Sequence, residues 1–379
     1  MAIMVADLLR GRVAADRAAT SRLASLDSLR GLAALSVVAC HYLILLADTP
    51  FGQRASSWLW LPPLSLIRSA YGAVILFFVL SGYVLALSLL GERKPSWGEF
   101  AARRFFRIWP PYAATILISF AIGHLAPTPG LNLASVWQIN TWHSDDLTVG
   151  ALVQQIGMAS SHIGLDVPAW SLVHELRISL AFPLLLVFVQ RAPATTLAAA
   201  FCLCQAERLG PPWLSYLVPD TATYIVYFAA GAWLALHRSR IAELGQRATA
   251  PAKALLCAIA LVLLSAPTEY PGAGISTGLG AVLLIVLVTA SPAIADILSA
   301  RWCVFLGRIS YSLYLTHIVV LMGLGRVLGA SFSVPLILAV AAPIIGLVGW
   351  IGYRWVEQPS IRLGRIVHAR FADAFQTAS

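Results

Sequence analysis

Two histidines, His41 and His317, each lie inside a long uncharged apolar stretch of the sequence. An ionisable side chain at membrane depth is costly, so its presence there indicates a functional site. Each stretch begins directly after an arginine, Arg30 for the first and Arg308 for the second. Helical rise places the imidazoles roughly 16 Å and roughly 13 Å beyond these arginines. If both helices leave the same membrane face, we expect the two histidines to meet in one site.

A second group of candidates is the segment FAARRFFRIWPPY at residues 100–112. Arg104 and Arg107 are three residues apart and share a helix face, with Trp109 nearby. Guanidinium groups match phosphate oxygens in a bidentate geometry, which predicts a phosphate-binding site. The alternative is that these arginines only set the orientation of the next helix in the membrane.

The third candidate segment is VPAWSLVHE at residues 167–175. Ser171 and Glu175 resemble a helix-capping pattern, and Trp170 suits a membrane interface, so a purely structural role is one alternative. A carboxylate at the start of an apolar helix can also orient an imidazole or bind hydroxyl groups. We therefore predict a catalytic role for Glu175, and acceptor contacts for Trp170 and Ser171.

Composition determines the class of protein that must position these residues. The chain is 59% hydrophobic and 11% charged, with a mean hydropathy of +0.79, far from an ordinary soluble domain. We predict an all-α, polytopic membrane helix bundle, because an open sheet cannot satisfy its backbone in lipid. About ten stretches are apolar enough to span; the fifth is short and is re-entrant or tilted. They lie near residues 29–47, 71–90, 110–126, 172–190, 192–206, 222–237, 253–267, 274–291, 305–323 and 334–354.

The basic residues predict the orientation of this bundle. Of the 26 Lys and Arg residues, 21 lie in one set of alternate connections and only four in the other. The positive-inside rule then places both termini in the cytoplasm. The net charge of +9 follows from topology, so no nucleic-acid partner is expected. The five cysteines show no metal-ligand spacing, and no metal is expected. We expect short cytoplasmic tails at residues 1–25 and 366–379 around one transmembrane domain at 26–365.

Six segments occur in the order seen in the membrane-bound acyltransferase family 3, which this chain resembles over roughly residues 26–365. One departure is Arg177-Ile178, where family members often carry an aromatic pair; this bears on the acceptor site. The six segments are Arg30-x10-His41, FFVLSGYV at 77–84, RRFFRIWPPY at 103–112, AWSLVHE at 169–175, YSLYLTH at 311–317 and YRWVEQP at 353–359.

The resemblance implies an O-acyltransferase (EC 2.3.1.-) of the inner (plasma) membrane that uses acetyl-CoA as donor substrate and no tightly bound cofactor. The phosphates of acetyl-CoA would contact Arg30, Arg104 and Arg107. The expected acceptor is a hydroxyl of an exported or surface glycan, and a small molecule such as a macrolide is the alternative. A neutral imidazole at His41 can act as general base or carry the acyl group itself, and the sequence leaves both open. A proton-coupled transporter is the competing class, although the inverted repeat typical of many transporters is not evident.

Overall fold

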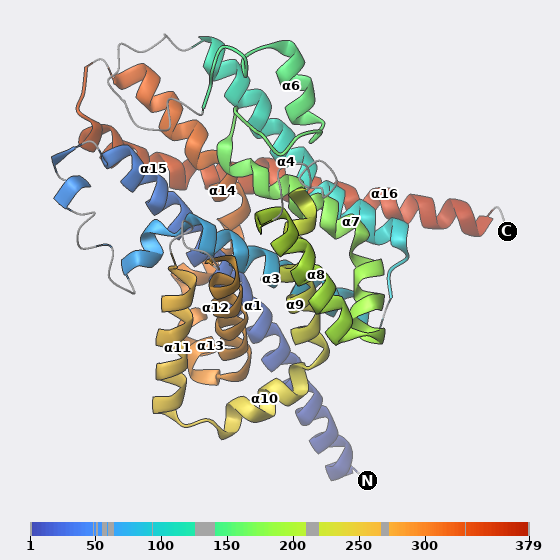
Figure 1. The fold of residues 1–379 in the computed structure, drawn as a ribbon. Helices are drawn as coiled ribbons and strands as arrows, with labels where there is room; N and C mark the ends of the chain where they lie inside the picture. Colours follow the sequence, from blue (N-terminus) through green and yellow to red (C-terminus); the bar gives the residue numbers. More distant parts are fainter. Residues whose placement is uncertain are drawn as a thin grey trace.

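A computed structural model describes most of the chain, and in the described residues it contains helices joined by turns and loops, with no β-strand. The described residues are 2–47, 49–50, 52–54, 59, 64–92, 94–125, 141–209, 220–266, 273–329 and 331–377. The predicted all-α class is therefore confirmed for this part of the chain. Figure 1 shows the helices gathered around α1 (Ala2–Leu46), α3 (Ala70–Leu90) and α14 (Arg301–Leu328).

Six helical segments of the described residues are long and apolar enough to cross a membrane. A seventh span results if α12 (Ala273–Ala290) and α13 (Pro292–Leu298), which bend by 96°, are taken together. Each of the ten predicted apolar stretches contains a helix in its described residues, but α8 (Pro193–Leu209), α9 (Ile225–Leu236) and α11 (Ala250–Leu264) are short. The predicted number of ten spans is thus not established by helix length. The six segments are Ala24–Leu46, Ala70–Leu90, Trp97–Leu125, Val167–Arg191, Arg301–Leu328 and Val334–Val367.

Helices α1 and α14 make a close crossing near one end of the bundle. A Cβ atom on Gly31 would lie 2.5 Å from the backbone N of Gly307, and one on Gly307 would lie 2.5 Å from the carbonyl O of Asp27. Only glycine allows the two backbones to approach so closely, as in other membrane helix pairs. His41 follows Gly31 by ten residues and His317 follows Gly307 by ten, so this crossing brings both histidines to the same height.

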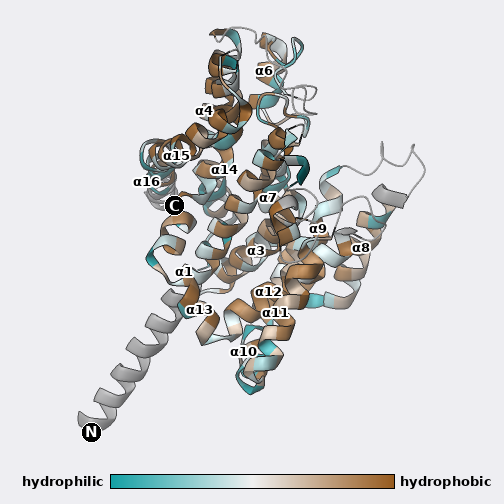
Figure 2. Ribbon diagram, turned by 90° about the vertical axis from the view of Figure 1, so that its left-hand side faces the viewer, coloured by the Kyte–Doolittle hydropathy of each residue, from teal (hydrophilic) through white to brown (hydrophobic). Residues whose placement is uncertain are grey.

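Helix α4 (Trp97–Leu125) begins earlier than the predicted span at residues 110–126 and continues through Pro110 and Pro111. Between α4 and α7 (Trp170–Arg191), the chain forms the short helix α6 (Val149–Ile156) and a 3-10 turn at Val167–Ala169. In Figure 2 this segment lies at the top of the bundle and carries hydrophilic residues, as does α10 (Arg238–Arg247) at the lower end. The segment covers the N-terminal end of α7.

The C-terminal part is one long helical segment with a change of pitch. Helix α15 (Val334–Gly352) passes through a π-helical turn at Tyr353–Glu357 into α16 (Gln358–Thr377). Helix α16 packs on α4, where Ser360 donates a hydrogen bond to the carbonyl O of Phe106. Single π turns inside α-helices are frequent at functional sites.

Candidate active site

The two predicted histidines meet in the interior of the bundle. Nδ1 of His41 lies 2.7 Å from Nε2 of His317, and the stacked rings have centroids 4.9 Å apart. Both side chains are buried, with His317 fully enclosed. Their meeting follows from the α1–α14 crossing, because equal ten-residue spacings on two helices that run together place both rings at one level.

The hydrogen bonds around this pair assign its tautomers. Nδ1 of His317 lies 2.6 Å from the carbonyl O of Tyr314, and a carbonyl oxygen can only accept. Nδ1 of His317 therefore carries the proton, and the neutral ring has its lone pair on Nε2. That nitrogen accepts from Nδ1–H of His41, which places the lone pair of His41 on its Nε2. The arrangement orients a proton-accepting nitrogen in the way a carboxylate orients the histidine of a catalytic triad.

Glu175 lies in a second polar cluster, built from α3, α4 and α7. Its Oε1 accepts a hydrogen bond from Nη2 of Arg104 at 2.8 Å and from Oγ of Ser81 at 3.0 Å. Both members of this ion pair are largely buried. The sequence predicts that this carboxylate orients an imidazole or binds hydroxyl groups, whereas the structure pairs it with Arg104, one of the predicted phosphate-binding arginines.

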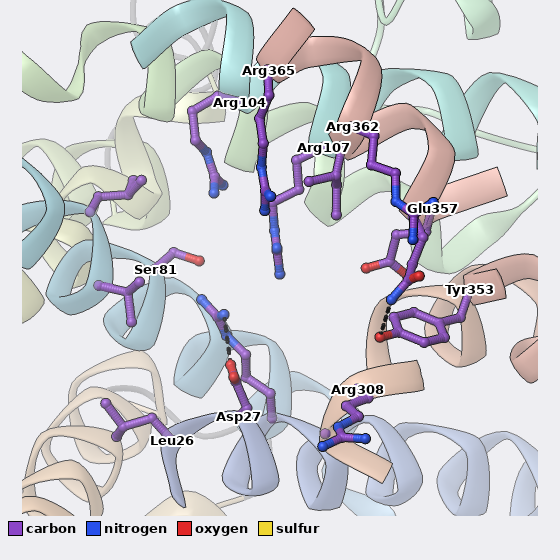
Figure 3. A pocket seen from close by; sticks show the side chains of 16 residues that line it. Leu26, Asp27, Ser81, Arg104, Arg107, Arg308, Tyr353, Glu357, Arg362 and Arg365 are labelled. Carbon is purple, nitrogen blue, oxygen red and sulfur yellow. Dashed lines mark hydrogen bonds and ion pairs between the residues drawn. The ribbon is translucent and has the colours of Figure 1, made fainter. Parts of the chain in front are cut away.

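A cavity of about 590 Å³ opens beside these groups and is strongly basic. Its volume is in the range of sites for small molecules and cofactors. Arg30, Arg104 and Arg107, the three predicted donor-binding residues, all line it. Figure 3 shows Arg104, Arg107, Arg362 and Arg365 entering from the upper side and Asp27 and Arg308 from the lower side.

A narrow second cavity of about 60 Å³ leads away from the basic one. The two share Arg30, Ser81 and Arg107, and the narrow cavity is also lined by Glu175, Ser171 and Tyr314. Tyr314 is the residue whose carbonyl binds His317. The narrow cavity therefore adjoins the basic cavity through their shared residues, and Tyr314 in its wall is a direct neighbour of His317.

The two predicted acceptor residues pack against neighbouring helices of the bundle. Ser171 is buried, and its Oγ lies 2.8 Å from the hydroxyl of Tyr314, which donates to the carbonyl of Pro168. Trp170 is partly buried and packs against Phe78 and Tyr224. It lies near the start of the candidate span Val167–Arg191, and its place at a membrane interface stays a prediction.

That covering segment contains a completely buried carboxyl group. Neither side-chain oxygen of Asp166 has a hydrogen-bond partner among the described residues, and burial raises the pKa of this carboxyl well above its usual range. Nearby, the indole of Trp142 donates to Ser119 Oγ and to the carbonyl of Leu165. Trp142 is therefore buried and offers no exposed ring on which a sugar acceptor could stack. The other tryptophans that could serve this purpose, Trp58, Trp60 and Trp137, lie outside the described residues.

Several residues of the site are not identified from the sequence. Glu357 is buried, and its Oε2 accepts from Oγ of Ser312 at 2.8 Å, in the wall of the basic cavity. Both residues belong to segments that resemble the acyltransferase family, YRWVEQP at 353–359 and YSLYLTH at 311–317. Membership of these segments is the one sequence feature that could have identified them. No sequence feature marks Arg362 and Arg365 of α16 as site residues, because arginines in an amphipathic terminal helix usually serve only to set membrane topology.

Comparisons with known proteins agree with one another. The profile of the acyltransferase domain family matches residues 23–354. The chain is also similar to a protein of Streptomyces mycarofaciens described as "Acyltransferase MdmB", with 29% identity over 90% of this chain and 92% of that protein. No solved structure matches.

Proposed function

Because this chain belongs to the acyltransferase domain family, we propose that it transfers an acetyl group from cytoplasmic acetyl-CoA to a hydroxyl of an exported or surface glycan. Family membership makes it an acyltransferase of groups other than amino-acyl groups (EC 2.3.1.-). With its long apolar helices it is a multi-pass membrane protein. The donor, the acceptor and the roles of individual residues are our proposal.

The observation that carries this proposal is that the basic cavity adjoins a narrow cavity lined by Tyr314, and that Tyr314 contacts His317 of the histidine pair. Coenzyme A joins a nucleotide with several phosphates to a slender, uncharged pantetheine arm that ends in the thioester. A wide cavity with Arg30, Arg104 and Arg107 suits the phosphates. A narrow passage that ends beside Tyr314 suits the arm. Arg30 and His41 are eleven residues apart on α1, and helical rise makes this roughly 16 Å.

In the proposed reaction His41 is the general base. Its Nε2 takes the proton of the acceptor hydroxyl while that oxygen attacks the thioester carbonyl carbon. The new C–O bond forms, the C–S bond breaks, and the protonated imidazole returns the proton to the leaving thiolate. The products are the acetyl ester and free CoA. His317 acts through His41, by accepting the Nδ1–H that fixes the reactive tautomer.

In addition to its predicted catalytic role, Glu175 has a positioning role. Its carboxylate accepts from both Arg104 and Ser81, so it holds the guanidinium of Arg104 at the entrance of the narrow passage. Ser171 hydrogen-bonds with Tyr314 and lies close to the end of the donor arm. We propose that Ser171 and Trp170 contact the acceptor from the opposite side.

An acyl-imidazole on His41 is the other route, and one labelling experiment separates the two. Reconstituted protein is incubated with [14C]acetyl-CoA without acceptor, and the protein-bound label is counted. Stoichiometric label in the wild type that is absent from His41→Ala supports the covalent route. No label, with CoA released only when an acceptor is added, supports general-base catalysis.

A macrolide or another apolar hydroxyl compound is the second candidate acceptor. An apolar cavity of about 560 Å³ lies between α7 and α8, where Leu184, Phe188 and Leu203 line it. Its polar end holds Arg177 and Thr221, and Thr221 also hydrogen-bonds with His174, the neighbour of Trp170 in the aromatic cluster. An apolar lining suits a macrolide better than a glycan.

The acceptor test offers both compound classes to the same protein. Liposome-reconstituted enzyme receives [14C]acetyl-CoA with either a polysaccharide repeat-unit fraction or a macrolide, and His41→Ala is the control. Label in the polysaccharide supports the first proposal, and label in the macrolide supports the second. No CoA release with either acceptor class, from protein that binds acetyl-CoA, would contradict both.

We further propose that α8, α9 and α11 also cross the membrane, which gives about ten spans with both termini cytoplasmic in the inner (plasma) membrane. The bias of basic residues toward alternate connections supports this topology. Reporter fusions that are active only outside the cytoplasm test it. We expect activity for fusions within residues 143–148 and none for fusions after α10. The reverse pattern would contradict the orientation.

A further inference from the structure

The basic cavity is completed by a helix that lies beyond the family match. The acyltransferase profile ends at residue 354, and α16 begins at Gln358. Nevertheless Ile361, Arg362 and Arg365 of α16 line the cavity together with Glu357 of the π turn. Four residues of the wall thus come from α16, a helix that the matched profile does not reach.

Helix α16 is fixed to the bundle along the stretch that faces the cavity. Glu357 is anchored to Ser312 of α14, and Ser360 is anchored to the backbone of Phe106 on α4. At Gly364 a Cβ atom would lie 2.8 Å from Cβ of Phe106, so glycine permits the close packing of α16 on α4. These three contacts hold Arg362 and Arg365, which are three residues apart and share a helix face, against the cavity.

The charges in the cavity are far from balanced. Six arginines line it and only two carboxylates, Asp27 and Glu357. The arginines are Arg30, Arg104, Arg107, Arg308, Arg362 and Arg365.

Most of these guanidinium groups are not matched by a carboxylate. Arg30 has Asp27 at 3.6 Å, and Arg104 has Glu175. The other four form no ion pair with a described residue. Like charges gathered in one cavity repel each other unless an anion occupies it, so the arrangement favours a polyanionic ligand.

We propose that Arg362 and Arg365 of α16, with Arg308 of α14, form a separate phosphate subsite for the nucleotide part of the donor. Arg30 and Arg107 line both cavities, and Arg104 is paired with Glu175 in the wall of the narrow one. Arg308, Arg362 and Arg365 line only the wide cavity and have no such link to the narrow one. They are therefore placed to recognise phosphate groups far from the thioester. The subsite makes the enzyme select nucleotide thioesters over short thioesters. This inference rests on the proposed use of acetyl-CoA as donor.

The test compares donors with and without phosphates. Transfer is measured with acetyl-CoA, acetyl-3′-dephospho-CoA and S-acetylpantetheine, for the wild type and for the double variant Arg362→Ala/Arg365→Ala. We expect the double variant to raise KM for acetyl-CoA at least ~10-fold, because charge-assisted hydrogen bonds are lost, with kcat unchanged. KM for S-acetylpantetheine should not change. A matched control, Arg240→Ala/Arg247→Ala in α10, removes two exposed arginines outside the cavity and should leave both KM values unchanged.

Two further variants separate recognition from folding. Arg362→Lys/Arg365→Lys should recover part of the acetyl-CoA affinity, because ammonium groups keep the charge and lose the bidentate geometry. Gly364→Leu should raise KM for acetyl-CoA without removing any charge, because the new side chain pushes α16 away from Phe106. An unchanged KM in the double Ala variant, or an equal rise for S-acetylpantetheine, would overturn the subsite.

Equilibrium binding of tritiated CoA distinguishes this inference from the proposed function. If the wild type binds CoA and transfers acetyl, but the α16 variants bind it equally well, only the subsite is wrong. If binding depends on Arg362 and Arg365 but no hydroxyl compound accepts acetyl, only the proposed function is wrong. If the wild type does not bind CoA, both are wrong.

Discussion

The role of His317 can be tested by a double-mutant cycle with His41. The change His317→Ala removes the acceptor that lies 2.7 Å from Nδ1 of His41, in a site where His41 is 7% exposed and His317 is 0% exposed. Water therefore replaces the lost acceptor poorly. A buried donor without a partner costs about 1–3 kcal/mol, and this energy is what favours the tautomer with its lone pair on Nε2.

The magnitude of the effect follows from that energy. Because each 1.36 kcal/mol corresponds to a factor of ten in rate, His317→Ala should lower kcat by about 5- to 150-fold. His41→Ala removes the proton acceptor and should lower kcat by about 10²–10⁴-fold. His41→Gln should be as slow, because an amide does not accept a proton at neutral pH. The double variant should be no slower than His41→Ala alone, because His317 acts only through His41.

The assay is release of CoA thiol with a saturating acceptor, measured on protein whose membrane insertion is confirmed for each variant. His143→Ala, an exposed histidine in the segment between α4 and α7, is the control and should retain the wild-type rate. Losses that multiply in the double variant would refute the relay from His317 to His41. A His41→Ala protein that inserts normally and acylates at the wild-type rate would refute the entire mechanism.

Three other perturbations address the donor site, the helix crossing and the buried carboxyl group. Arg104→Ala/Arg107→Ala should raise KM for acetyl-CoA at least ~10-fold with normal insertion. The control Arg103→Ala, which loses an ion pair with Glu99 outside the cavity, should leave KM unchanged. A KM in the double variant equal to that of the wild type would mean that Arg104 and Arg107 only set the topology. Gly31→Leu should lower the thermal unfolding temperature and kcat together, because a side chain there meets the backbone of Gly307; a stable, fully active variant would contradict the crossing. Because burial raises the pKa of Asp166, the folded state holds this proton more tightly than the unfolded one, so stability should fall as pH rises above about 4 toward the folded pKa. Asp166→Asn should flatten this decline in melting temperatures measured between pH 5 and 8, and an unchanged pH profile would contradict the shift.

The sequence predicted the histidine pair because the necessary information is local. Arg30 and Arg308 mark where two apolar stretches begin, and helical rise then places His41 and His317 at similar depth. The tautomer order was not predictable, since it depends on the carbonyl of Tyr314. That contact requires the rotamer of His317, which packing decides.

The position of Glu175 shows where sequence reasoning fails. Hydropathy marks the start of α7 as a membrane boundary, but it does not reveal that the chain before it folds back over that end. The backbone of Leu165 and the indole of Trp142 are joined across this covering segment, which buries the N-terminal end of α7. Hydropathy likewise does not show that α4 packs on α7, which brings Arg104 to Glu175, or that α4 begins well before the predicted span at residue 110.

The π turn at Tyr353–Glu357 sets the rotational phase of the last helix. A π turn holds one residue more than the α-helical turn it replaces, and each residue advances an α-helix by about 100°. With one residue fewer here, everything after the turn would be rotated by that angle about the helix axis. Arg362 and Arg365 would then point away from the cavity, and Gly364 would no longer meet Phe106. The single extra residue of the π turn thus determines the direction of two cationic side chains more than one helical turn further along the chain.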